Sequence, residues 1–248
     1  MSKEYYTSIK SRDGFGAQYQ RIIQTYIVCK NNNLNFVYTP LEHLEHNYDN
    51  DKDYNNKLEN LINFKKNITN TDETMNVKEI DYGSIILKQF ESKIDYFCES
   101  QHMQFIKDCF WENKNRDCFK NDKINVAVHI RRDNISDKGA AGDRVTTPNS
   151  YYFNIMNTIR DKKACENKQL LFHVYSQGEL YQFQDLSNND VNFYINSDII
   201  ETFIGMVSAD ILITSPSSFS YVAALISDGE IHYKKFWHEP RKEWIIHK

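Results

Sequence analysis

Two adjacent arginines follow an apolar run near the middle of the chain, in the segment His129-Ile130-Arg131-Arg132-Asp133-Asn134. The run at residues 124–130 is nearly continuous, which is typical of a strand buried in a parallel sheet. Two guanidinium groups at a strand end are costly to hold together without an anion. A diphosphate would supply that anion through charge-assisted hydrogen bonds worth roughly 1.5–3 kcal/mol each. The alternative for this segment alone is a surface arginine pair bridged to Asp133.

A hydroxyl-rich turn, Thr214-Ser215-Pro216-Ser217-Ser218-Phe219-Ser220, follows another apolar run and opens a helical pattern at residues 219–226. The first N–H groups of a helix have no acceptor within the helix and lie at the positive end of its dipole, so they bind phosphate. The alternative is an N-cap by Ser217 or Ser218. The two interpretations are compatible, because a capped helix can still receive a phosphate.

Two further turns follow expected strands. Ser176-Gln177-Gly178-Glu179 comes directly after the apolar residues 170–175, and its glycine predicts a sharp turn that would face a base or a ribose. Gly14-Phe15-Gly16-Ala17-Gln18 lies between a strand at residues 5–9 and a helix through residues 22–27. It lacks the third glycine of the dinucleotide-binding fingerprint, because position 19 is Tyr. Gly14 and Gly16 would still let the backbone approach a ligand.

The elements that must position these turns alternate between strand and helix. In the second half, we expect strands at residues 124–130, 170–175, 191–195, 210–214 and 230–233, with helices at 151–163, 200–208 and 219–226. In the first half, we expect strands at 5–9 and 35–38 around the helix, a polar helix at 54–64 and further helix at 85–118. This pattern predicts α/β structure with parallel sheets, which bind ligands beyond the carboxyl ends of their strands. The boundary between the halves is expected near residue 120.

Composition excludes several classes of protein. The formal net charge of −4 argues against a general nucleic-acid or membrane-surface binder. Five cysteines form an odd set, and the gaps between Cys98, His102, Cys109 and Cys118 fit no zinc pattern. No stretch is apolar enough to span a bilayer, and the first residues do not resemble a signal peptide. We therefore expect a cytoplasmic or otherwise soluble chain with no membrane anchor and no bound metal.

Four segments, taken in order, resemble the fucosyltransferases of the α-1,2, α-1,6 and protein-O-fucosyl groups. Residues 14–18 are similar to the N-terminal G-x-G-x-Q turn of that superfamily, and residues 129–132 to its H-x-R-R-x-D donor motif. Residues 147–152 resemble the Pro-x-x-Tyr-Tyr segment of the α-1,2 group, and residues 209–225 its S-S-F-S-x-x-A-x-L block. The resemblance chiefly covers residues 124–226 and the short N-terminal turn.

One position departs from the family pattern. The family leaves one residue between the arginines and the aspartate, whereas Asp133 follows Arg132 directly here and Asn134 occupies the usual aspartate position. Either the loop is one residue shorter or that carboxylate is missing.

The resemblance implies a GT-B fold, in which two Rossmann-like domains with parallel sheets face a cleft. Residues 1–120 would be the acceptor-side domain, and residues 121–248 would bind the nucleotide sugar. The implied activity is metal-independent, inverting transfer of fucose from GDP-fucose to a glycan hydroxyl, with the nucleotide-sugar donor and a carbohydrate acceptor as partners. No cofactor is implied beyond the GDP-sugar substrate.

Fixed arginines and helix N–H groups would stabilise the charge that develops on the leaving GDP. The expected donor-binding residues are Gly14, Gly16, His129, Arg131, Arg132, Ser176, Ser217, Ser218, Phe219 and Ser220. The acceptor hydroxyl also needs a base. The candidate catalytic residues are Arg132, Asp133 and Asp143, with Asp13, Glu42 and His43 as candidates from the first half.

Two other functions remain open at this point. The first is transfer of another nucleotide-activated sugar on the same fold, because a fold does not fix the substrate. The second is a non-catalytic relative that keeps the nucleotide site, which the position of Asp133 favours. A Ser-His-Asp hydrolase is disfavoured, because the serines lie in a cap-like turn without a nucleophile elbow.

Overall fold

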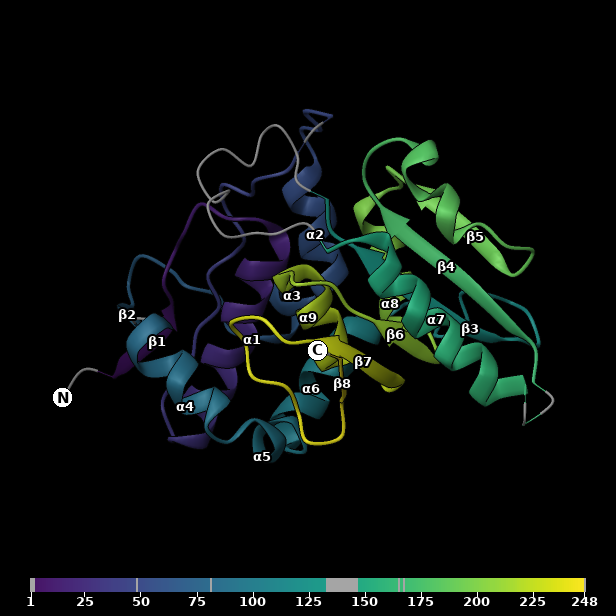
Figure 1. The fold of residues 1–248 in the computed structure, drawn as a ribbon. Coiled ribbons are helices and arrows are strands. Elements are labelled where there is room, and N and C mark those ends of the chain that lie inside the picture. The colour runs from purple at the N-terminus through teal and green to yellow at the C-terminus, as the bar shows by residue number, and fades with distance from the viewer. Residues whose placement is uncertain are drawn as a thin grey trace. The chain divides into compact units, whose positions relative to one another are not determined.

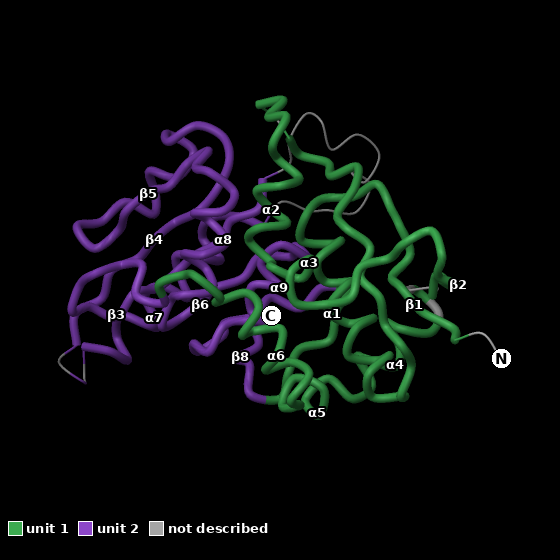
Figure 2. The backbone as a smooth tube through the Cα atoms, turned by 180° about the vertical axis from the view of Figure 1, so that it is seen from behind, with its two compact units in different colours: residues 1–115, 237–242 green, residues 116–236, 243–248 purple. Residues whose placement is uncertain are grey.

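The computed structural model describes residues 3–47, 49–80, 82–132, 147–164, 166 and 168–247. The chain forms two compact units (Figure 2). Unit 1 comprises residues 1–115 and 237–242, and unit 2 comprises residues 116–236 and 243–248. The main division thus falls at residues 115 and 116, and the chain also returns to unit 1 for six residues near its end. Nothing in the sequence pattern indicates that return.

Unit 2 contains a six-stranded parallel sheet with the order β5-β4-β3-β6-β7-β8 (Figure 1). Its elements are β3 (Ile124–Ile130), α7 (Asn149–Ala164), β4 (Leu170–Ser176), the 3₁₀ helix η2 (Leu180–Leu186), β5 (Val191–Ile195), α8 (Ile199–Ser208), β6 (Ile211–Ile213), α9 (Ser218–Ile226), β7 (Glu230–Lys234) and β8 (Ile245–His247). Numbered along the chain, the strands follow the order 3-2-1-4-5-6 of doubly wound, Rossmann-like sheets. The parallel α/β structure expected for this half is confirmed; η2 and β8 are additions that the sequence did not predict.

Helices cover both faces of this sheet. The strand β3 contacts both layers, because successive side chains of a strand point to opposite faces. Val126, Val128 and Ile130 belong to a core that α7 completes on one face. The α7 residues in this core are Tyr152, Ile155, Met156 and Ile159. His129 contacts Phe219 of α9, with ring centroids 5.5 Å apart. Phe219 in turn lies against Phe203 of α8. The carboxyl end of β3 therefore lies between α7, which covers one face of the sheet, and α9, which covers the other.

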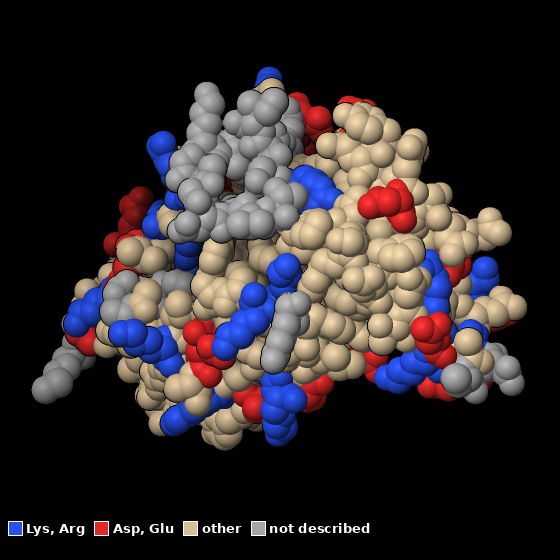
Figure 3. Space-filling view, in the orientation of Figure 1, with Lys and Arg blue, Asp and Glu red and all other residues tan. Residues whose placement is uncertain are grey.

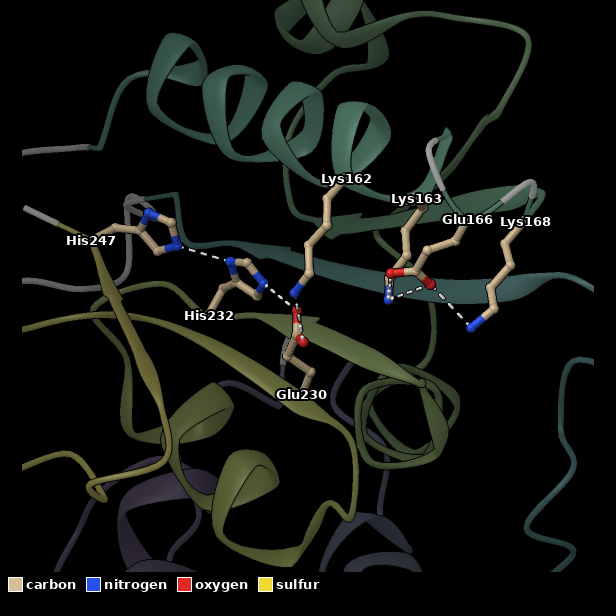
Figure 4. A network of polar contacts seen from close by, with 7 residues as sticks. All are labelled: Lys162, Lys163, Glu166, Lys168, Glu230, His232 and His247. Carbon is tan, nitrogen blue, oxygen red and sulfur yellow. Dashed lines mark hydrogen bonds and ion pairs between the residues drawn. The ribbon is translucent and has the colours of Figure 1, made fainter.

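A pair of histidines holds the last strand at the edge of the sheet (Figure 4). His232 Nδ1 of β7 lies 2.8 Å from His247 Nε2 of β8, and the rings stack with centroids 5.0 Å apart. His232 Nε2 lies 3.0 Å from Glu230, whose carboxylate also accepts a hydrogen bond from Lys162 of α7. Burial lowers the pKa of His232 despite Glu230, and it lowers the pKa of His247 as well. Two neutral imidazoles can share one hydrogen bond, so this contact links β8 to β7 at neutral pH.

Unit 1 has a smaller parallel sheet, formed by β1 (Glu4–Ser8) and β2 (Asn76–Ile80). Single parallel bridges join Tyr6 to Phe36 and Tyr38 to Asn70. The helices are α1 (Phe15–Asn31), α2 (Tyr54–Ile62), α3 (Phe64–Asn67), the π-helix η1 (Tyr82–Ile86), α4 (Leu87–Glu91), α5 (Ile94–Cys98) and α6 (Gln101–Trp111).

Three details of unit 1 differ from the sequence-based expectation. Residues 35–38 form isolated bridges rather than a full strand. The helix expected at 85–118 is divided into shorter helices and ends at Trp111. Strand β2 was not expected, because its sequence N-V-K-E-I has no apolar alternation and three of its five side chains are exposed. Only its pairing with β1 identifies it as a strand.

Candidate functional site

The strand order of unit 2 reverses between β3 and β6, which are neighbours in the sheet. From its carboxyl end, β3 leads toward α7 on one face, and β6 leads into α9 on the other. Such a reversal leaves a crevice outside the carboxyl ends of the two strands, where open α/β sheets bind ligands. The two sequence segments at residues 129–132 and 214–220 therefore meet at this one edge.

A buried hydrogen bond joins the two segments directly. His129 Nδ1 of β3 lies 2.8 Å from Ser215 Oγ, in the turn after β6. Burial, with the nearby charge of Arg131, lowers the pKa of His129 to about 3. The imidazole is therefore neutral at pH 7, and its Nδ1 is occupied by the serine hydroxyl. His129 holds the serine turn against β3, and it is a poor candidate for a general base.

The serine turn is stabilised from within. Ser217 is the N-cap of α9, and its Oγ accepts a hydrogen bond from the N–H of Phe219 at 3.3 Å. Ser220 is fully buried; its Oγ accepts from the Ser215 N–H and donates to the Ser215 carbonyl, at 3.2 and 3.1 Å. Ser217, Ser218 and Phe219 are half-buried. The N-cap expected from the sequence is confirmed, and these three residues can reach a ligand while Ser220 shapes the turn.

The two arginines have different neighbours. Arg132 donates a hydrogen bond to the carbonyl of Thr147 at 3.1 Å and another to the side chain of Asn149, at the start of α7. Its guanidinium lies 5.2 Å from the centre of the Phe183 ring. Arg131 lies close enough to His129 for its charge to lower the pKa of that histidine. Arg131 lies near His129, which contacts the serine turn, and Arg132 lies beside the start of α7.

Asn149 is a residue whose role the sequence did not indicate. Its side chain binds Arg132 and donates to Asp185 at 2.7 Å and to the carbonyl of Gln182 at 2.7 Å. It thus connects the first turn of α7 to η2. The only signal was its place in the segment at residues 147–152, which resembles a fucosyltransferase motif without assigning a role to this asparagine.

The turn after β4 has the sharp geometry that its glycine predicts. Gly178 has φ +117°, and a Cβ at this position would lie 2.3 Å from the Gln182 side chain. Two hydrogen bonds of 3.0 and 2.8 Å join its backbone to the Asn196 side chain. Ser176 is buried and donates to the carbonyl of Ile130 at 2.8 Å. Ser176 therefore ties the end of β4 to the end of β3.

The remaining candidates belong to unit 1 or fall outside the described residues. Asp133 and Asp143 are outside the described residues. Gly14 and Gly16 belong to unit 1, where Gly14 is the N-cap of α1 and Gly16 is buried in its first turn. Asp13, also in unit 1, forms an ion pair with Arg21 at 2.6 Å. The site in unit 2 is therefore built from the ends of β3, β4 and β6 with the starts of α7 and α9.

The protein matches no family model and no curated protein sequence. Across the described ranges, no group of three His, Cys, Asp or Glu residues could hold a metal ion. The helices in the same ranges are all too short or too polar to cross a membrane. On the face shown in Figure 3, basic and acidic side chains are interspersed. The fold and the local geometry therefore carry the functional argument.

Proposed function

We propose that the protein is a glycosyltransferase that binds a nucleotide-sugar donor, GDP-fucose, at the carboxyl edge of the sheet in unit 2. One observation carries the proposal: the hydrogen bond between His129 and Ser215 joins the strand that the arginines follow to the helix that the serine turn opens. Both segments resemble fucosyltransferase motifs, and they meet where the strand order reverses.

The chemistry of this edge suits a diphosphate. The N–H groups in the first turn of α9 have no carbonyl acceptor within the helix, so they can donate to a ligand. The helix dipole adds positive potential at the same place. Arg131, whose charge acts on His129, adds a full positive charge at this edge of the sheet. As the bond to the sugar breaks, negative charge grows on the GDP leaving group, and these fixed donors stabilise it. Arg132 and Asn149 position the start of α7 on the other side.

The full reaction needs more than the donor site. We propose that the two units form a GT-B arrangement and that unit 1 supplies the acceptor. Asp133 and Asp143 remain the proposed sources of a catalytic base in unit 2. The position of Asp133 directly after Arg132 also favours a second candidate, a nucleotide-binding relative without transfer activity.

Ligand-induced stabilisation tests the donor class. GDP is expected to raise the melting temperature of the full chain, since a ligand that binds only the folded form stabilises it by RT ln(1 + [L]/Kd). UDP, dTDP and ADP at the same concentration serve as controls and are expected to have smaller effects. A larger shift with UDP or dTDP would assign another nucleotide sugar, and no shift with any nucleotide would contradict the proposal.

A turnover assay then separates a transferase from a binding protein. Release of GDP from GDP-fucose in the presence of a mixed glycan acceptor pool is expected to exceed release without acceptor. If GDP binds but acceptors never stimulate its release, the non-catalytic alternative is correct.

A further inference from the structure

Unit 1 contains a cavity of about 160 Å³ at the carboxyl end of β1. Its lining combines cations, a carboxylate, hydroxyls and apolar side chains. The lining residues are Ser8, Ile9, Lys10, Ser11, Arg12, Gln18, Arg21, Ile22, Thr39, Pro40, Leu41, Glu42 and His43. Pockets for drug-sized molecules hold about 300–1,000 Å³. This smaller cavity suits one residue the size of a sugar ring.

Two loops form the rim, and a buried glutamine holds them together. Gln18 is 8% exposed and donates from Nε2 to the carbonyl of Asp13 at 3.0 Å and to that of Glu42 at 3.2 Å. A backbone hydrogen bond of 3.1 Å from Glu45 to Asp13 joins the same loops. The rim is therefore formed in advance, which lowers the entropic cost of binding.

The charged groups around the cavity include one more cation than carboxylates. Lys10 pairs with Glu42 at 3.0 Å, and Arg21 pairs with Asp13 at 2.6 Å. Arg12 is exposed at the rim, and it forms no ion pair within the part of the chain that the structure describes. Among the charged lining residues and their ion-pair partners, three cations face two carboxylates, which gives a net charge of +1. A ligand with a single negative charge matches this balance, whereas the double charge of a phosphate monoester would lie close to Glu42.

The other lining groups match the rest of a sugar. A carboxylate such as Glu42 accepts hydrogen bonds from ring hydroxyls, and Lys10 donates to them. Ile22, Pro40 and Leu41 offer apolar surface for the ring carbons. We propose that this cavity binds one acidic sugar residue, a hexuronate, through its carboxylate to Arg12, and that this residue belongs to the acceptor glycan. The assignment of this residue to the acceptor glycan rests on the proposed function, whereas the binding of a hexuronate does not.

Titration calorimetry on the full chain tests the binding directly. Methyl glucuronide is expected to bind, and methyl glucoside is expected to bind at least tenfold more weakly because it lacks the carboxylate. Arg12→Gln is expected to weaken methyl glucuronide binding at least tenfold, since it removes the charge-assisted hydrogen bond to the carboxylate. Arg116→Gln is the matched control, because Arg116 is an exposed arginine of unit 2, and this variant should bind like the wild type.

The outcomes separate this proposal from the donor site. Tighter binding of glucose 6-phosphate than of methyl glucuronide would assign the cavity to phosphate and overturn the proposal. Equal binding of glucuronide and glucoside, or no effect of Arg12→Gln, would also overturn it. GDP affinity of Arg12→Gln is expected to equal that of the wild type. If the wild type binds the glucuronide but not GDP, the proposed function fails while the cavity assignment stands.

Discussion

Replacing Arg131 with alanine is expected to weaken GDP binding about 100-fold and to leave the melting temperature within a few degrees of the wild type. Arg131 is half-exposed, and its charge acts on His129, which contacts the serine turn. A bidentate contact to a diphosphate supplies two charge-assisted bonds of roughly 1.5–3 kcal/mol each, and about 1.4 kcal/mol corresponds to a factor of ten. Isothermal titration calorimetry with GDP measures the loss.

Two other arginines serve as comparisons. Arg116→Ala removes the same side chain from an exposed ion pair with Asp228, and it should bind GDP like the wild type. Arg132→Ala is also expected to weaken GDP binding, but with a lower melting temperature, because it loses the hydrogen bonds to Thr147 and Asn149. An unchanged GDP affinity in Arg131→Ala would remove that residue from the donor site.

Acid is expected to destabilise the protein as the pH falls below about 6.5. Burial and the charge of Arg131 lower the pKa of His129 to about 3, and burial lowers the pKa of His173 to about 4. In the unfolded chain both titrate near 6.5. Below that pH the unfolded state binds protons that the native state does not, so each histidine lowers the free energy of unfolding by about 1.4 kcal/mol per pH unit. Together they account for about 5 kcal/mol between pH 6.5 and 4.5.

Conservative variants isolate this effect. His129→Asn can retain a hydrogen bond to Ser215, and His173→Gln can retain the one from His173 Nε2 to Asn125. The urea midpoint of each variant should fall less steeply than that of the wild type as the pH is lowered from 7.5 to 4.5. His43→Gln, at an exposed position, is the control, and its urea midpoint should fall as steeply as that of the wild type. Parallel curves for all four proteins would show that neither buried histidine governs the acid response.

The sequence predicts the architecture of unit 2 well because each buried element leaves a strong pattern. Five of the seven residues of β3 are apolar, and the helices on both sides have regular apolar spacing. Edge elements leave weaker patterns. Strand β2 reads as a polar loop, and β8 has exposed isoleucines and depends on the contact between His232 and His247. Such strands are specified by their partners, which a single segment does not contain.

The sequence predicted which segments form the site, but it did not predict the neighbours of each side chain. Local sequence placed His129 and the serine turn at strand ends, and parallel topology is enough to bring those ends together. It did not reveal that Arg132 has different neighbours from Arg131, since that depends on tertiary contacts of Arg132 with Asn149 of α7 and Phe183 of η2. It also gave Ser220 a possible ligand contact, whereas burial and its hydrogen bonds to Ser215 give it a structural role.

A crystal structure of the full chain with GDP would locate the donor site itself. The diphosphate is expected within hydrogen-bonding distance of the Arg131 guanidinium and of the backbone N–H groups at the start of α9, beside the hydrogen bond between His129 and Ser215. Nucleotide bound at any other edge of the sheet, or a crevice between β3 and β6 that protein side chains fill, would contradict it.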